Sequence, residues 1–164
     1  MLNNLRLVLL GVLLTLSSCG YQLIRSDIAN DVSFSVPTAS NGSSFRGLES
    51  QLTQSTRQQL HSLIGAQLKS GSCDYSLELT IRKAQRSARV WSRSGGVNMG
   101  IIYLTVSYQL LDSSKQKVLD NSISRNQEFL LSTGEDTSHA FNEAVADIAQ
   151  QIVMEIAEHL TSNN

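Results

Sequence analysis

The segment Ile101-Ile102-Tyr103-Leu104-Thr105-Val106-Ser107-Tyr108-Gln109-Leu110 carries the strongest fold signal in this chain of 164 residues. Every second residue from Ile102 to Leu110 is a large apolar residue or Tyr, whereas Thr, Ser and Gln take most of the positions between them. Successive side chains of a β-strand point to opposite faces of the sheet. The alternation therefore predicts a strand whose Ile102 side packs into a core.

Two further strands are predicted beside this segment. Upstream, apolar and polar residues alternate from Tyr75 to Arg82, and a Gly-containing segment, Ser92 to Gly100, leads into the central strand. Downstream, Asp112-Ser113-Ser114-Lys115 predicts a hairpin turn before a strand from about Val118 to Leu130. Because Asn121 to Gln127 is mostly polar, this last strand suits the edge of the sheet or a surface that contacts another molecule.

Two helices are predicted from apolar residues at helical spacing. The first runs from Phe45 to about Lys69, and Ser70-Gly71 provides its end. The second runs from Asp136 to about Leu160, and Asp136 suits an N-terminus, where exposed amide groups accept an acidic side chain. The apolar stripe of the second helix comprises Phe141, Val145, Ile148, Ile152, Ile156 and Leu160.

A short strand from Val32 to Val36, which Pro37 ends, completes the order strand, helix, three strands, helix. A turn-rich loop, Thr38 to Ser44, follows this first strand. The helical connection allows parallel pairing of the first two strands, whereas the tight turns favour antiparallel pairing later in the chain. The sequence therefore predicts an α+β fold, a two-layer sandwich of two helices on one face of a four-stranded mixed β-sheet.

The N-terminal residues have the layout of a bacterial lipoprotein signal. An apolar run, Leu7 to Leu16, follows Arg6, and it is shorter than the about 20 residues that span a membrane. Leu16-Ser17-Ser18-Cys19 matches the lipobox, in which small residues precede a cysteine that is lipidated after cleavage before it. The alternative is an ordinary secreted protein whose cleavage site lies beside a cysteine.

Lipidation of Cys19 sets the expected organisation of the chain. Fatty acyl chains such as palmitate would anchor the protein stably, because each buried methylene contributes roughly 0.8 kcal/mol. We therefore predict a signal peptide at residues 1–18, a lipidated tether at 19–31 and a single domain at 32–164. Residue 20 is Gly, whereas Asp at this position commonly retains a lipoprotein in the inner membrane. The expected location is thus the outer membrane.

Several function classes are disfavoured by composition and motifs. The formal net charge of −1 creates no field that would recruit nucleic acid. His61, His139 and His159 lie at spacings that build no metal site. Neither a Gly-x-Ser-x-Gly motif nor a phosphate-binding loop is present. We predict no catalytic residues, no metal and no cofactor. Cys73 would be either a shielded thiol or an exposed one that pairs between molecules.

The charge along the chain is uneven. Five of the thirteen Lys and Arg residues fall within twelve positions, and no acidic residue lies between Glu78 and Asp112. Arginine makes paired hydrogen bonds to phosphate, and an indole can pack against apolar or sugar groups. The candidate binding residues are Arg82, Lys83, Arg86, Arg89, Trp91 and Arg93. The alternative is a solvated strand end whose charges discourage edge pairing.

The sequence resembles the LptE family, the lipopolysaccharide-assembly lipoproteins of the outer membrane. The resemblance rests on Cys19-Gly20-Tyr21 directly after the lipobox, on a short strand ending in Val36-Pro37, and on the helix opening Gly47-Leu48-Glu49 with Leu52-Thr53 behind it. The order of elements and the length of the mature chain agree with the family as well. Each motif is weak by itself, and the combination carries the resemblance.

The resemblance implies a non-catalytic partner of a large outer-membrane β-barrel, the LptD-type lipopolysaccharide translocon. Members of this family plug the barrel, support its assembly and bind lipopolysaccharide through basic residues at one end of the sheet. Arg82 to Arg93 occupies the corresponding region. The protein would be anchored by its lipid and face the periplasm. The alternative function is a lipoprotein tethered to the outer membrane that activates a cell-wall synthase.

Overall fold

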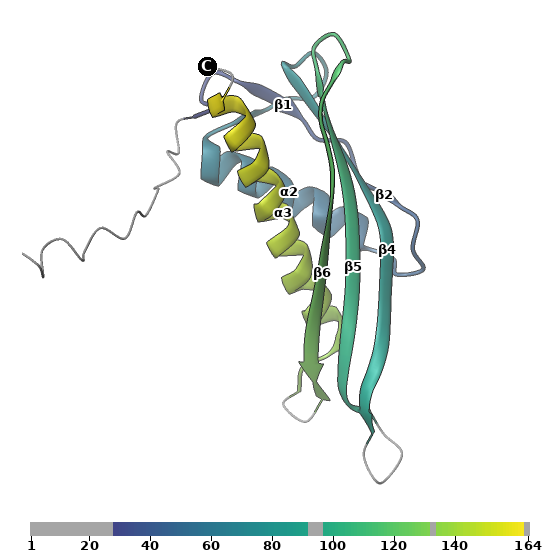
Figure 1. Cartoon of the computed structure of the whole chain (residues 1–164). Coiled ribbons are helices and arrows are strands. Elements are labelled where there is room, and N and C mark those ends of the chain that lie inside the picture. The colour runs from purple at the N-terminus through teal and green to yellow at the C-terminus, as the bar shows by residue number, and fades with distance from the viewer. Residues whose placement is uncertain (1–27, 92–96, 132–133, 163–164) are drawn as a thin grey trace, which may run out of the picture.

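Three long antiparallel strands form the body of the sheet (Figure 1). The computed structural model describes residues 28–91, 97–131 and 134–162. Within these residues the sheet has six strands, and both helices pack on the same side of it. The elements are β1 (Ser33–Ser35), β2 (Ser40–Asn41), α2 (Leu48–Ile64), β3 (Gln67–Leu68), β4 (Tyr75–Trp91), β5 (Val97–Asp112), β6 (Lys117–Leu130) and α3 (Thr137–Ser162).

The sheet is mixed, with the strand order β3-β1-β4-β5-β6, and β2 pairs with β4. β1 is parallel to both β3 and β4, whereas β5 is antiparallel to both of its neighbours, β4 and β6. The predicted α+β fold with two helices over one sheet is confirmed, and β6 is an edge strand. The described sheet has six strands rather than the predicted four because β2 and β3 contribute two residues each.

α2 ends earlier than the sequence predicted. Gly65 adopts a left-handed conformation with φ 72°, which a glycine reaches without steric cost. The N–H groups of Gly65 and Ala66 donate to the carbonyl oxygens of His61 (3.2 Å) and Leu60 (3.1 Å), as in a helix C-cap. Leu68, which is inside the predicted helix, instead pairs with Phe34 in the sheet and is 43% exposed.

β4 and β5 are longer than predicted and form one continuous hairpin. Their pairing runs from Tyr75 opposite Asp112 to Trp91 opposite Val97. The sequence pattern predicted that the first of these strands would end near Arg82. That end was wrong, because the residues from Lys83 to Arg89 also lie within β4.

α3 supplies the largest share of the core from the helix layer. Its N-terminus is capped as predicted, since Asp136 Oδ1 accepts a hydrogen bond of 2.8 Å from the His139 N–H. The predicted apolar stripe is confirmed, because all six of its residues are buried. Each fully buried large apolar side chain contributes about 1.5–3 kcal/mol to stability, so the contact between α3 and the sheet accounts for much of the cohesion of the domain.

A glycine marks a close approach inside the sheet. Gly100 lies opposite Phe129 in the β5–β6 pair, and a Cβ built on Gly100 would lie 2.3 Å from Phe129 Cζ. We therefore expect Gly100→Ala to displace the Phe129 ring and to lower the free energy of unfolding by about 1–3 kcal/mol. Urea unfolding followed by circular dichroism measures this change.

Phe129→Leu provides the control for the Gly100 substitution. If the ring is the obstacle, Gly100→Ala should cost less in the Phe129→Leu background than in the parent protein, because residues in contact are energetically coupled. An equal cost in both backgrounds would contradict the proposed clash.

Candidate functional site

One side of the long sheet lies away from both helices, and we call this side the open face (Figure 1). Three of the predicted binding residues lie on it. Arg82 Nε donates a hydrogen bond of 2.8 Å to Ser107 Oγ, and Arg89 forms a 3.0 Å ion pair with Glu128. Lys83 Nζ lies 5.9 Å from the centroid of the Tyr103 ring.

An irregularity in β4 brings Arg82 and Lys83 to the same face. The register of β4 against β5 shifts between Ile81 and Lys83, as it does at a β-bulge, where two residues of one strand oppose one of the other. In a regular strand Arg82 would share a face with Arg86 and lie opposite to Lys83. The shift therefore gathers two adjacent cations on the open face.

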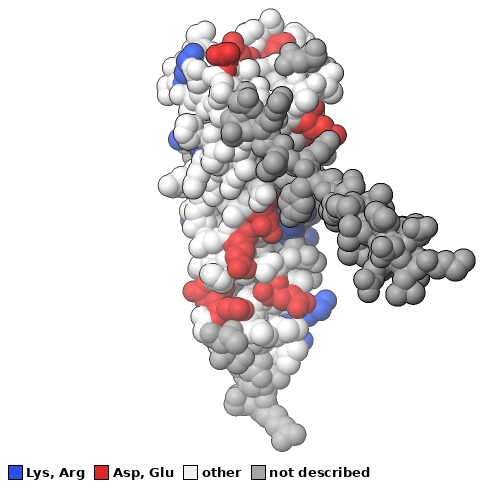
Figure 2. All heavy atoms as spheres, turned by 90° about the vertical axis from the view of Figure 1, so that its left-hand side faces the viewer, with Lys and Arg blue, Asp and Glu red and all other residues white. Residues whose placement is uncertain are grey.

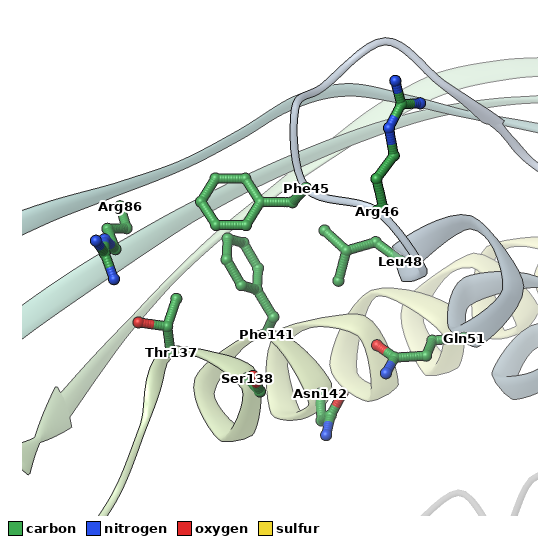
Figure 3. Close-up of a pocket in the computed structure, with 9 residues that line it drawn as sticks. All are labelled: Phe45, Arg46, Leu48, Gln51, Arg86, Thr137, Ser138, Phe141 and Asn142. Carbon is green, nitrogen blue, oxygen red and sulfur yellow. The ribbon is translucent and has the colours of Figure 1, made fainter.

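Arg86 belongs to the other side of the sheet. It pairs with Ile102, which is fully buried under the helices. Arg86 lines a hollow of about 200 Å³ between the sheet, the loop before α2 and the start of α3. Figure 3 shows Arg86 near the rings of Phe45 and Phe141, whose centroids are 4.7 Å apart. The predicted cluster is thus divided between two sides of the sheet.

Three of the predicted site residues are described only in part or not at all. Trp91 is the last residue of β4 and pairs through its backbone with Val97. Arg93 and Cys19 lie outside the described residues. The roles expected of these residues remain predictions.

The cations of the open face are accessible to an external anion. Arg89 and Glu128 have side chains that are 55% and 53% exposed, and exposed ion pairs of this kind contribute only about 0.2–1 kcal/mol. Lys83 has no acidic partner among the described residues. A phosphate group that binds Arg89 would therefore compete only with a weak ion pair to Glu128.

The helix side of the molecule carries several acidic side chains. Figure 2 shows the helix side, where Asp and Glu side chains gather over the middle of the surface and Lys and Arg side chains lie mainly at its margins. An anionic ligand is repelled by such a surface. The helix side is therefore a poor site for an anionic ligand.

A connected polar cluster lies between the sheet and α3. Glu155 accepts hydrogen bonds from Tyr108, from Asn121 (2.9 Å) and from Gln151 (3.0 Å). Burial, together with the hydrogen bond and charge of Glu155, raises the pKa of Tyr108. Burial also acts to raise the pKa of Glu155, but the three hydrogen bonds outweigh it and lower that pKa. Each member already has a partner, so the cluster fixes α3 on the sheet.

Features of a metal site or a membrane span are not found in the described part of the chain. No group of three His, Cys, Asp or Glu side chains there could hold a metal ion. None of the described helices is both long enough and apolar enough to cross a bilayer. Cys73 is half-buried and has a free thiol.

Comparison with known proteins gives a family and a fold. A family model described as LptE, Lipopolysaccharide-assembly, matches residues 32–160. No curated protein matches the sequence to a significant degree.

Three solved structures illustrate the fold. A hypothetical protein from Chlamydia trachomatis has 10% identity and a TM-score of 0.61, covering 80% of this chain and 98% of its own. Rare lipoprotein B from Shewanella oneidensis has 17% identity and a TM-score of 0.56, covering 79% of this chain and 97% of its own. Lipoprotein B from Nitrosomonas europaea has 12% identity and a TM-score of 0.54, covering 77% of this chain and 82% of its own. At these identities the likeness shows the fold alone.

Proposed function

This chain belongs to the LptE family of lipopolysaccharide-assembly proteins. We propose that it binds lipopolysaccharide and plugs an outer-membrane β-barrel. The partner would be an LptD-type lipopolysaccharide translocon, whose assembly this protein would support. The role is non-catalytic and needs no cofactor. Neither the described residues nor the comparisons favour the alternative role, activation of a cell-wall synthase.

The grouping of basic residues on the open face carries the proposed binding of lipopolysaccharide. Arg82, Lys83 and Arg89 lie on one surface, and the lipid A part of lipopolysaccharide carries phosphate groups. Guanidinium and ammonium groups bind phosphate through charge-assisted hydrogen bonds. Trp91 and Arg93 follow in the sequence and remain predicted contacts of the ligand, while Arg86 would reach the ligand only from the helix side.

The polar character of the open face supports the proposed plug. Thr105, Ser107, Ser122, Ser124 and Asn126 lie on this face between the charged groups. The interior of a membrane β-barrel that holds a plug is polar. Side chains of this kind can form hydrogen bonds with such a wall, whereas an apolar interface would leave the polar groups of the wall unpaired.

The N-terminus would place the domain at the membrane. Cleavage before Cys19 and acylation of that residue would leave a short tether before the first described residue, Ile28. The domain would then be held at the periplasmic side of the outer membrane by its lipid.

Charge reversal on the open face tests the proposed binding. We expect Lys83→Glu with Arg89→Glu to weaken binding of lipopolysaccharide about tenfold or more at low salt, because two attractive contacts with phosphate become repulsive. The effect should shrink at high salt, because exposed charges are screened. The measurement is a titration of the purified protein with lipopolysaccharide at two salt concentrations.

A matched control is the double variant Lys69→Glu with Lys115→Glu. Both side chains are exposed and lie outside β4, and the change in net charge is the same. If the two double variants bind equally well, general charge rather than the open face governs binding. Affinity equal to that of the parent in the Lys83 and Arg89 variant would refute the proposed contact with phosphate.

A further inference from the structure

An exposed aromatic side chain lies at the centre of the open face. Tyr103 of β5 is 37% exposed. It pairs with Gln85 of β4 on one side and with Asn126 of β6 on the other. Side chains directly opposite each other on neighbouring strands have Cβ atoms about 4.5–5.5 Å apart. Two amide groups therefore flank the phenol ring.

A hollow of about 340 Å³ opens beside this ring. Its lining consists of Lys83, Tyr103, Thr105, Ser124, Arg125 and Asn126. Thr105 Oγ1 and Ser124 Oγ are hydrogen-bonded to each other at 2.9 Å. Since each hydroxyl offers one donor and two acceptor positions, the pair keeps one donor and three acceptor positions for another molecule.

The other polar groups around the ring are also available. Among the described residues no hydrogen bond engages the side chains of Gln85, Tyr103 or Asn126. Arg125 is already held by the Ser124 carbonyl oxygen (3.1 Å) and by Gln151. Lys83 is the cation that remains free to contact a ligand, and it reaches over the ring.

This combination of groups matches the chemistry of a sugar. The C–H groups on one side of a pyranose ring pack against an aromatic ring, and its hydroxyls exchange hydrogen bonds with amide and hydroxyl side chains. An apolar ligand would leave the surrounding amides unpaired. The Lys83 ammonium group adds a preference for a sugar that carries a carboxylate or a phosphate.

We propose that the Tyr103 hollow is a subsite for an acidic saccharide, and that its occupant is the sugar part of lipopolysaccharide. The proposal rests on the proposed binding of lipopolysaccharide and assigns a second part of that ligand to the open face. Phosphates of lipid A would bind the basic groups of β4, and the attached sugars would lie over Tyr103, which is between β4 and the edge strand β6.

The test uses the oligosaccharide that mild acid hydrolysis releases from lipopolysaccharide, free of lipid A. We expect it to bind the mature protein in detergent micelles, as measured by isotope-edited NMR. Tyr103→Ala should weaken this binding about fivefold or more, because the stacking surface is lost. Tyr103→Phe keeps the ring and should stay within about twofold of the parent. A thermal melt checks that both variants are folded.

Each other outcome is decisive. Binding of intact lipopolysaccharide without binding of the oligosaccharide would overturn the saccharide subsite and leave the proposed function in place. Failure of both ligands to bind would overturn both proposals. Unchanged affinity in Tyr103→Ala would place the oligosaccharide elsewhere on the protein. Equal binding of a muramic-acid disaccharide, an acidic saccharide of the cell wall, would overturn the assignment to lipopolysaccharide.

Discussion

Replacing Ile148 with Asp should abolish the cooperative folded state of this domain or leave it barely stable. Ile148 lies in the middle of the α3 stripe and is fully buried, with 0% exposure. Asp at this position would put a carboxylate into the core without a partner, and burying an unpaired charge costs several kcal/mol. The loss of the apolar contacts adds about 2–5 kcal/mol. A domain of this size has a total stability of about 5–15 kcal/mol.

Urea unfolding monitored by far-UV circular dichroism would measure the loss of stability in Ile148→Asp. The matched control is Gln150→Asp, which introduces the same side chain two residues further along α3 at an exposed position. We expect this control to shift stability by about 0.5 kcal/mol or less. A midpoint that is unchanged in Ile148→Asp would show that the stripe does not face the core.

Cys19→Ala should remove the acyl modification and leave the domain folded, in a soluble or uncleaved form that is lost from the outer membrane. Acylation of Cys19 is the only anchor that the sequence predicts, and several acyl chains on one residue hold a protein far more firmly than a single chain. Without the thiol no diacylglycerol can be attached. Fractionation of cells grown with labelled palmitate should then show no label on the variant and a loss of protein from the outer-membrane fraction.

Cys73→Ala is the control for the lipidation experiment. Cys73 is a half-buried thiol beside the start of β4, so its replacement should leave both the label and the membrane fraction unchanged. Label retained on Cys19→Ala, or lost from Cys73→Ala, would contradict lipidation at Cys19.

The parts of the fold that the sequence predicted are those with a long repeating pattern. The alternation in β5 and the stripe of α3 continue over many residues, so a single exception does not obscure them. β2 and β3 are two residues long, and such a length carries no period. At the end of α2 the helical spacing of Leu68 indicated a longer helix, but the left-handed conformation of Gly65 ended it.

The candidate site was predictable in composition but not in geometry. The density of basic residues in β4 was visible from the sequence, whereas the side of the sheet on which each one lies depends on the register against β5. The shift between Ile81 and Lys83 has no clear sequence signal, since bulges follow from strand pairing. From the sequence, Tyr103 is simply one residue of a strand, because its neighbours Gln85 and Asn126 come from two other strands.

The position of β1 determines how a pull on the N-terminus is resisted. β1 is the first strand after the N-terminal segment, yet it lies between β3 and β4 rather than at an edge. The Arg57 Nε atom also donates a hydrogen bond of 3.1 Å to the carbonyl oxygen of Val36, the residue directly after β1. A force along β1 would shear the hydrogen bonds to both neighbours at the same time, whereas an edge strand would peel away bond by bond. In a domain that is tethered by its N-terminus, a pulling force is therefore resisted by hydrogen bonds on both sides of β1.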